Sequence, residues 1–154
     1  MLFAQSASAH EFVATLTDIL DGDTLSAVIH DENVKIRLLD VDCYETTKNK
    51  RAGFQHEYYG LSYDEIIENG NKSKEKLKKL LKDHRYIRVK WKSRDSFGRI
   101  LGHVYLDDIK SAGITDVNKY MLETVNCNKY MPKKLKKTAT KIGKMPVKHL
   151  IPQK

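Results

Sequence analysis

Five short runs of β-forming residues constrain this chain most, because they alternate in polarity and are separated by turn residues. Residues 11–30 are β-rich, and the turn Asp21-Gly22-Asp23 divides them into two strands. A second turn, Asp31-Glu32-Asn33, leads into a third strand and completes a three-strand meander. This third strand is Val34–Val41, and the remaining two expected strands are Tyr86–Trp91 and Arg99–Leu106.

Helices are expected between the third and fourth strands and after the fifth. Residues 43–71 read as polar and irregular, with one short helical piece that begins at the capping box Ser62–Glu65 and stops at Asn69-Gly70. A lysine-rich helix follows over about residues 72–83. The last helix is capped by Asp116.

The order strand, strand, strand, helix, strand, strand, helix matches a small closed barrel of the oligonucleotide-binding type. The expected fold class is therefore α+β and mainly β: a five-stranded OB-fold barrel flanked by two or three helices. A chain of 154 residues suits one domain. We expect that domain to span residues 10–131 and a lysine-rich C-terminal tail to span residues 132–154.

Charge is unevenly distributed along the chain, whose net charge is +8. Residues 1–71 carry 13 acidic and 5 basic side chains, whereas residues 72–94 carry 11 basic and 2 acidic ones. Residues 132–154 hold 8 lysines and no acid. Basic segments raise the local concentration of a polyanion, and an acidic half can hold a cation. The alternative is that the lysines form ordinary solvated surfaces.

Several features exclude function classes or leave them open. No apolar run approaches the ~20 residues that span a bilayer, and no nucleotide-binding glycine loop or zinc spacing occurs. Cys43 and Cys127 make at most one bridge, nothing suggests a disulfide scaffold, and the redox compartment stays open. Residues 1–9 end like a signal-peptidase site but lack a basic start, so the sequence does not separate a secreted from a cytoplasmic location.

Acids and arginines gather in three clusters of this strand map: residues 21–24, 37–45 and 95–99. Taken singly, each has an unremarkable interpretation. Asp-Gly-Asp is above all a turn former, and Glu45 could be an ordinary loop acid. Arg37 could be an edge residue or an ion-pair partner, and Arg99 could be a charge at the start of a strand.

Together, the three clusters resemble the staphylococcal nuclease-like (thermonuclease) family over about residues 12–126. The segments that carry the resemblance are Ala14–Thr24, Val34–Glu45 and Asp95–Leu106. The resemblance implies a five-stranded OB barrel flanked by helices. It also implies Ca²⁺-dependent hydrolysis of phosphodiester bonds in DNA and RNA.

The same resemblance implies a calcium site. The side chains of Asp23 and Asp42 and the backbone carbonyl of Cys43 would bind the ion, with Asp21 acting through water. Calcium takes oxygen ligands and keeps waters, so these groups suit it. The family usually has Thr at the position of Cys43 and Pro at that of Tyr44. A main-chain ligand survives the first change, whereas losing the proline loosens the loop that positions Glu45.

Residue-by-residue matching makes Glu45 the general base that draws a proton from the attacking water. Arg37 and Arg99 would bind the scissile phosphate and stabilise charge on its oxygens, a task that suits the fork of guanidinium donors. Phe97 falls where the family carries an aromatic that packs on the bound nucleotide; equally, it could cover the barrel mouth. Tyr130 offers another stacking surface.

The sequence thus predicts a nuclease that acts on DNA and RNA with Ca²⁺, prefers single strands and works as a monomer; endonuclease or exonuclease mode stays open. By resemblance, cleavage breaks the bond to the 5′ oxygen and leaves 3′-phosphate ends. One alternative is an OB-fold module that binds nucleic acid but cuts weakly or not at all. Another is a protein-interaction domain, which predicts no nucleic-acid affinity even at low salt.

Overall fold

The computed structural model describes residues 10–108, 113–124 and 127–130. The expected leader and the tail at 132–154 lie outside the described residues. The strands and helices of the described part are β1 (His10–Ile19), β2 (Thr24–Ile29), β3 (Glu32–Leu38), β4 (Val41–Asp42), α1 (Lys50–Tyr59), α2 (Tyr63–Leu81), β5 (Tyr86–Arg94), β6 (Ile100–Asp108), β7 (Gly113–Asp116), α3 (Val117–Thr124) and β8 (Asn128–Lys129).

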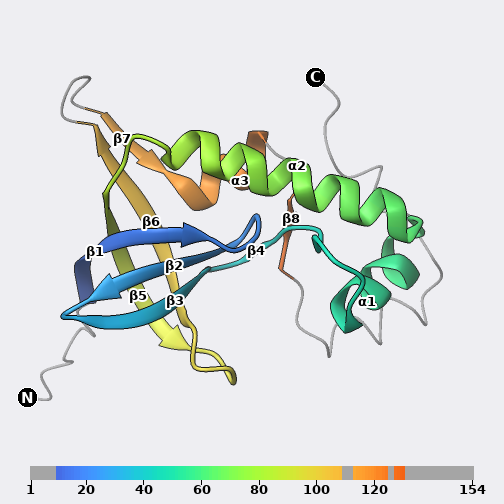
Figure 1. Cartoon of the computed structure of the whole chain (residues 1–154), viewed down its shortest axis with the longest axis horizontal. Helices are drawn as coiled ribbons and strands as arrows, with labels where there is room; N and C mark the ends of the chain where they lie inside the picture. Colours follow the sequence, from blue (N-terminus) through green and yellow to red (C-terminus); the bar gives the residue numbers. More distant parts are fainter. Residues whose placement is uncertain (1–9, 109–112, 125–126, 131–154) are drawn as a thin grey trace, which may run out of the picture.

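Five strands close into a barrel, as the sequence predicts. The sheet order is β3-β2-β1-β5-β6-β7, and β3 also pairs with β6. Strand β1 pairs antiparallel with β2 and β5, and so do β2 with β3 and β5 with β6. Strands β3 and β6 run parallel, with Ile36 opposite Ile100. This parallel pairing joins β3, at one edge of the sheet, to β6, so β1, β2, β3, β5 and β6 form a mixed five-stranded barrel (Figure 1). The fold class is therefore confirmed.

The tight turns explain where strand boundaries differ from the expected ones. His30 and Asp31 have φ values of 48° and 65°, which fits a two-residue hairpin turn one position earlier than expected. Asp40 has a φ of 61°, so the strand expected through Val41 breaks after Leu38 and resumes as β4. Short polar residues tolerate this left-handed backbone better than bulky ones do.

The core fills the barrel and the space between it and the helices. It contains mainly aliphatic side chains from every barrel strand, with Leu77 and Leu81 of α2 and Met121 of α3 packed against them. The sequence predicts that Ile87, Val89 and Trp91 share one face of β5; Ile87 and Val89 are buried, whereas Trp91 is exposed. Burial of one face of each strand and of α2 therefore fixes the helix on the barrel.

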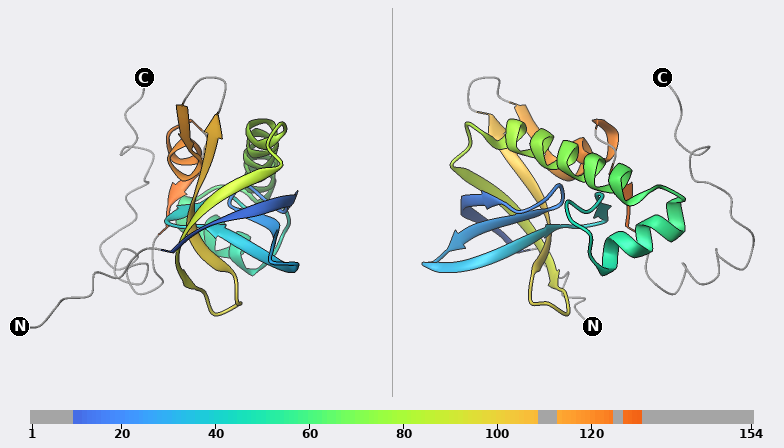
Figure 2. Two further views of the ribbon diagram at one scale, coloured as in Figure 1. Left: turned by 90° about the vertical axis from the view of Figure 1, so that its left-hand side faces the viewer. Right: turned by 45° about the vertical axis from the view of Figure 1, so that its right-hand side comes forward.

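The helical insertion differs most from expectation. Residues 50–59 form helix α1, whereas the sequence analysis predicted irregular structure there. Helix α2 begins at the predicted Ser62–Glu65 capping box but continues through Asn69-Gly70 to Leu81. The expected stop at Gly70 and the separate helix from residue 72 are therefore wrong. Figures 1 and 2 show α2 running along the barrel, with α1 beside its N-terminal end.

Gly70 lies inside α2 because the helix approaches another segment closely there. A Cβ at this position would lie 2.2 Å from the backbone oxygen of Glu45. Glycine in a helix interior costs about 1 kcal/mol relative to alanine, and close packing outweighs this cost. The residue that reads locally as a helix stop is therefore a packing site between α2 and the loop that carries Glu45.

The C-terminal elements are short. Asp116 caps α3 as predicted, since its Oδ1 accepts a hydrogen bond from the backbone N of Lys119 at 3.0 Å. Strands β7 and β8, which were not predicted, pair with β6 and β4 respectively. Within the described ranges, no helix is long and apolar enough to cross a membrane.

Candidate functional site

The turn between β1 and β2 is the first part of the site. The Oδ1 of Asp21 accepts a hydrogen bond from the backbone N of Asp23 at 2.9 Å, which folds the turn back on itself. A Cβ at Gly22 would lie 2.7 Å from Ser73 Cβ and 2.9 Å from Cys43 Cβ. Because the turn is pressed between α2 and the segment after β4, the side chain of Asp23 is buried.

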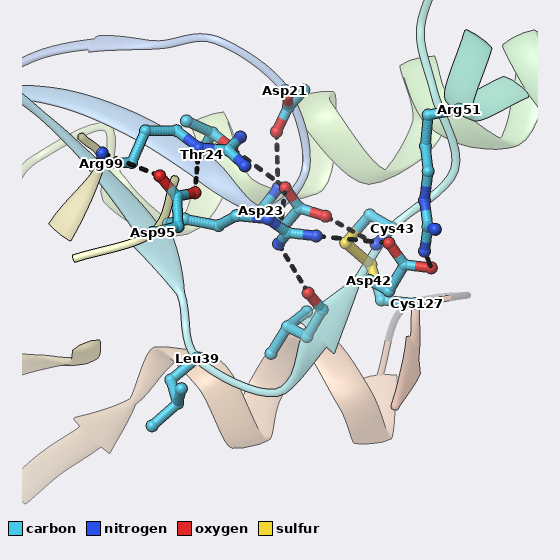
Figure 3. Close-up of polar contacts among 12 residues, drawn as sticks. Asp21, Asp23, Thr24, Leu39, Asp42, Cys43, Arg51, Asp95, Arg99 and Cys127 are labelled. Carbon is cyan, nitrogen blue, oxygen red and sulfur yellow. Dashed lines mark hydrogen bonds and ion pairs between the residues drawn. A yellow bond between two sulfur atoms is a disulfide. The ribbon is translucent and has the colours of Figure 1, made fainter. Parts of the chain in front are cut away.

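Arg37 brings two of the predicted acids together. It lies in β3 opposite Thr24 of β2, so its side chain reaches the end of the β1–β2 turn. Its Nη1 lies 3.3 Å from Oδ1 of Asp23, and its Nη2 lies 3.3 Å from Oδ1 of Asp42. Nη1 also donates to the backbone oxygen of Val41 at 2.8 Å. Two carboxylates, from the β1–β2 turn and from β4, therefore meet at one guanidinium; Figure 3 labels both aspartates.

Asp23 is the most perturbed acid of the site. Its Oδ2 accepts a hydrogen bond from the backbone N of Cys43 at 2.8 Å, and its Oδ1 accepts one from the Thr24 hydroxyl at 3.0 Å. Burial raises the pKa of Asp23 to about 8; Arg37 lowers it, and the nearby Asp21 and Asp42 raise it. Burial therefore disfavours the ionised form of the Asp23 carboxyl, and Arg37 offsets part of that cost.

Cys43 forms a disulfide with Cys127, which the sequence analysis did not predict. The bond extends the β4–β8 ladder by one position, since Val41 pairs with Lys129 and Asp42 with Asn128. It joins residues 84 positions apart and holds the start of β8 beside the site. Two cysteines this far apart carry no local spacing signal, so only the fold reveals the pairing.

Glu45 follows two residues later on the same loop. Its Oε2 accepts a hydrogen bond from Asn49 Nδ2 at 2.6 Å, and its backbone N donates to Gln55 Oε1 at 3.0 Å. Burial raises the pKa of Glu45, the Asn49 hydrogen bond lowers it, and the charges of Asp21 and Asp42 raise it. The acid predicted as general base therefore shares the electrostatic environment of the buried aspartates.

Arg99 lies on a separate turn between β5 and β6. Oδ1 of Asp95 accepts hydrogen bonds from the backbone N of Phe97 and of Arg99, and its Oδ2 accepts one from Arg99 Nε at 2.7 Å. Gly98 has a φ of 77° and completes the turn. In the described part of the chain, Arg99 pairs with Asp95 and not with Asp23 or Asp42. Phe97 is 83% exposed beside it, so it does not cover the barrel mouth.

Three side chains from α1 and its N-cap also belong to the site, and the sequence analysis missed them. Arg51 Nη2 lies 2.5 Å from Oδ2 of Asp42, on the opposite side of the acids from Arg99 (Figure 3). Gln55 Nε2 donates to the backbone oxygen of Cys43 at 3.0 Å. Asn49 is the third. Because residues 43–71 were read as irregular, no helical spacing linked these positions.

Tyr130 lies close to both arginines of the buried cluster. The ring centroid is 5.6 Å from Cζ of Arg37 and 5.8 Å from Cζ of Arg51. The backbone N of Tyr130 donates to the backbone oxygen of Asp40 at 2.8 Å. The aromatic ring suggested by the sequence therefore stands at the site, at the end of the segment that the disulfide fixes.

The donor groups here suit a hard divalent cation. Asp23 in the β1–β2 turn and Asp42 on β4 supply carboxylate oxygens, and Cys43, whose N donates to Asp23, has a main-chain carbonyl oxygen that accepts from Gln55. Over residues 10–108, 113–124 and 127–130, no three His, Cys, Asp or Glu side chains form a metal cluster. A cation here would take two carboxylates, a carbonyl and water, as Ca²⁺ can. The arginines and Gln55 now contact these same oxygens.

Comparison with known proteins agrees with this picture. The family model described as staphylococcal nuclease homologue matches residues 35–142. The match includes the positions of Arg37, Asp42, Glu45 and Arg99, and it starts after the β1–β2 turn. A search of curated proteins found no match.

Proposed function

The chain belongs to the staphylococcal nuclease homologue family, and from this premise we propose that it is a Ca²⁺-dependent nuclease that hydrolyses phosphodiester bonds of DNA and RNA. Family membership implies a nucleic-acid substrate. The observation that carries the finer proposal is the meeting of Asp23 and Asp42 at Arg37, with Glu45 on the same loop as Asp42. We also propose that single strands are preferred and that the protein acts as a monomer.

Arg37 and Arg99 are the proposed phosphate ligands. Guanidinium donors fixed in place before the reaction stabilise negative charge that develops on phosphate oxygens. Arg37 is held by Val41 and the two aspartates, so it is fixed before substrate arrives. Arg99 is oriented by Asp95 within its own turn.

Glu45 is the proposed general base. A carboxylate with an ordinary pKa is a weak base near neutral pH, and burial raises the pKa of Glu45 toward the working range. Asn49 keeps its carboxylate oriented. Calcium bound by Asp23, Asp42 and the Cys43 carbonyl would supply positive charge next to the phosphate.

Phe97 and Tyr130 are the proposed contacts to the bases. Phe97 is largely exposed at the tip of the turn that carries Arg99, and Tyr130 lies against Arg37. Aromatic rings stack on nucleobases without reading their sequence, which suits an enzyme that accepts both DNA and RNA.

The test is hydrolysis of single-stranded DNA and RNA by the full chain with added Ca²⁺ or with EDTA. We expect Ca²⁺-dependent cleavage that leaves 3′-phosphate ends, and EDTA should abolish it. Glu45→Gln should lose most of the turnover while still binding single-stranded DNA. Cleavage that chelation leaves unchanged would refute the calcium role.

The second candidate function is a module that binds nucleic acid without cutting it. One observation favours it: Arg51 occupies an oxygen of Asp42, the acid that calcium needs. Such a module would bind single strands equally well in Ca²⁺ and in EDTA, with no products in either. The two candidates therefore separate in one experiment.

A further inference from the structure

We propose that helix α1 is a working part of the site and that Gln55 is a positioning residue, which holds the loop of Asp42, Cys43 and Glu45 through a single side-chain amide. This inference rests on the proposed function, because the effect of Gln55 is measured on the turnover of the proposed reaction. Gln55 touches neither the phosphate nor the attacking water in this proposal; it acts on the residues that do.

The side chain of Gln55 spans the loop at two points. Its Nε2 donates to the backbone oxygen of Cys43 and its Oε1 accepts from the backbone N of Glu45, both at 3.0 Å. Gln55 is fully buried, so no water replaces either bond. Buried amides need partners for both ends, and here both partners flank Tyr44. One side chain therefore fixes the backbone on each side of that residue.

The loop needs such an external hold. Tyr44 lies between the two bonded groups, and unlike proline it does not fix its own φ angle. The opposite side of the loop meets α2, where a Cβ at Gly70 would lie 2.2 Å from Glu45 O. The segment from Cys43 to Glu45 is thus held between Gln55 of α1 and the backbone of α2.

Two more side chains of the same helix reach the same loop. Asn49, the N-cap of α1, accepts from the backbone N of Ala52 through Oδ1 and donates to Glu45 through Nδ2. Arg51 pairs with Asp42. Asp42, Cys43 and Glu45, the three predicted site residues of the loop, are thus each bound by a side chain at position 49, 51 or 55.

Helix α1 is itself well anchored. Asn49 caps its first turn, Gly60 ends it in a left-handed conformation with its N–H bonded to the oxygen of His56, and Ala52 is buried. Functional groups held by rigid elements keep their geometry better than those on free loops. A misplacement of 1 Å at a reacting group can cost as much as about 10²-fold in rate. Loss of Gln55 should therefore lower turnover more than substrate binding.

The experiment compares Gln55→Met with the wild-type chain. Methionine fills a similar volume and makes neither hydrogen bond. We expect kcat on single-stranded DNA to fall about 10–100-fold while KM stays within about 3-fold. Hydrogen exchange of the Glu45 amide, measured by NMR, should accelerate because its acceptor is gone.

Asn49→Ser gives a second variant at an exposed position. Serine still caps α1 but is too short to reach Glu45, so kcat should again fall with little change in KM. If Gln55→Met fails to fold, this variant still tests whether α1 is a working part of the site, and an unchanged kcat would overturn that part of the proposal.

Two matched controls separate positioning from stability. Glu57→Gln changes the exposed face of α1 and should leave kcat and KM unchanged. Ile66→Val removes a buried methyl group from α2, so it should lower Tm without changing kcat.

The outcomes distinguish this inference from the proposed function. A wild-type chain that cuts nothing sinks the proposed function, whereas the exchange rate of the Glu45 amide still tests the Gln55 contact. A wild-type chain that cuts, together with a folded Gln55→Met variant of equal kcat, overturns the positioning role. Equal falls in kcat for Ile66→Val and Gln55→Met would reduce Gln55 to a structural residue and overturn it as well.

Discussion

The candidate site has two halves that are built in opposite ways. The buried half, Asp23, Arg37, Asp42 and the Cys43–Cys127 disulfide, draws on segments distant in sequence and lies inside the protein. The turn half, Asp95 to Arg99, consists of five consecutive residues whose hydrogen bonds are made within the turn or to Arg94. The buried half therefore depends on the whole fold, whereas the turn half depends on almost nothing else.

The contrast shows that removing a charged side chain of the candidate site can lower the free energy of unfolding by very different amounts in the two halves. Removing a partner from a buried ion pair leaves an uncompensated charge that water cannot reach. Removing a side chain from the partly exposed turn should cost less, because ion pairs that water reaches contribute about 0–1 kcal/mol. Substitutions in the buried half should thus affect folding and activity together, and those in the turn half activity alone. Four predictions test this contrast.

The largest expected effect is that of the disulfide. Replacing both Cys43 and Cys127 by Ala removes a link across 84 positions and should lower the free energy of unfolding by about 4–5 kcal/mol through added freedom of the unfolded chain. Urea unfolding followed by circular dichroism measures it. The wild-type chain in excess dithiothreitol should shift similarly, and unchanged midpoints in both cases would contradict the structural role of this bond.

Arg37→Met should have the next largest effect. It leaves the buried carboxylates of Asp23 and Asp42 without their shared partner, so we expect a loss of about 3–5 kcal/mol at pH 7, along with loss of cleavage. The matched control is Arg88→Met, since Arg88 pairs with Glu11 and Asp107 at the surface. That change should cost about 1 kcal/mol or less. Similar losses for the two variants would contradict the distinction between a buried arginine and a partly exposed one.

Arg99→Ala tests the turn half. We expect kcat/KM to fall about 10²–10³-fold, or about 2.7–4 kcal/mol of transition-state stabilisation. The free energy of unfolding should change by about 1 kcal/mol or less, because the only carboxylate partner of Arg99 within the described ranges is the nearby Asp95. A variant that keeps wild-type turnover would remove the catalytic role assigned to Arg99.

The smallest expected effect concerns Asp95 and acid. Burial would raise the pKa of Asp95, but hydrogen bonds from the Arg99 side chain and from the backbone N of Arg99 and Phe97 hold it below its usual value. Because the folded-state pKa is lowered, the stabilisation is fully present above the unfolded pKa of about 3.9 and is lost as pH falls through the folded pKa.

Asp95→Asn should therefore cost about 1 kcal/mol or less at pH 7, and the difference from the wild-type chain should shrink below about pH 4. Unfolding measured at several pH values would show this convergence. A gap that widens in acid would mean that the sign of the pKa shift is wrong.

The barrel was predictable from sequence because its signals are local. Alternation places Ile87 and Val89 in the core, the Asp21-Gly22-Asp23 turn separates two strands, and Ser62 with Glu65 starts a helix. The acids and arginines could be found because they fall on those strands and turns. The roles given to them remain predictions, which the experiments above address.

The features that were missed depend on contacts between distant segments. Gly70 reads as a helix stop until the backbone of Glu45 is placed against it. Gln55 is an ordinary polar residue until its amide spans Cys43 and Glu45, and α1 has too weak an apolar pattern to stand out. The disulfide likewise forms because β4 pairs with β8, and the positions of the two cysteines in the sequence do not reveal that pairing.

The parallel pairing of β3 with β6 has a consequence for the order in which structure and activity form during folding. Arg37 lies on β3 and Arg99 immediately precedes β6, so the pairing of these two strands, which are far apart in the sequence, brings the two arginines toward the same end of the barrel. Contacts between such distant segments form slowly, since the long intervening chain must first be ordered. A refolding chain should therefore recover its helices early and its turnover late, and the delay between the two would measure the rate at which the barrel closes.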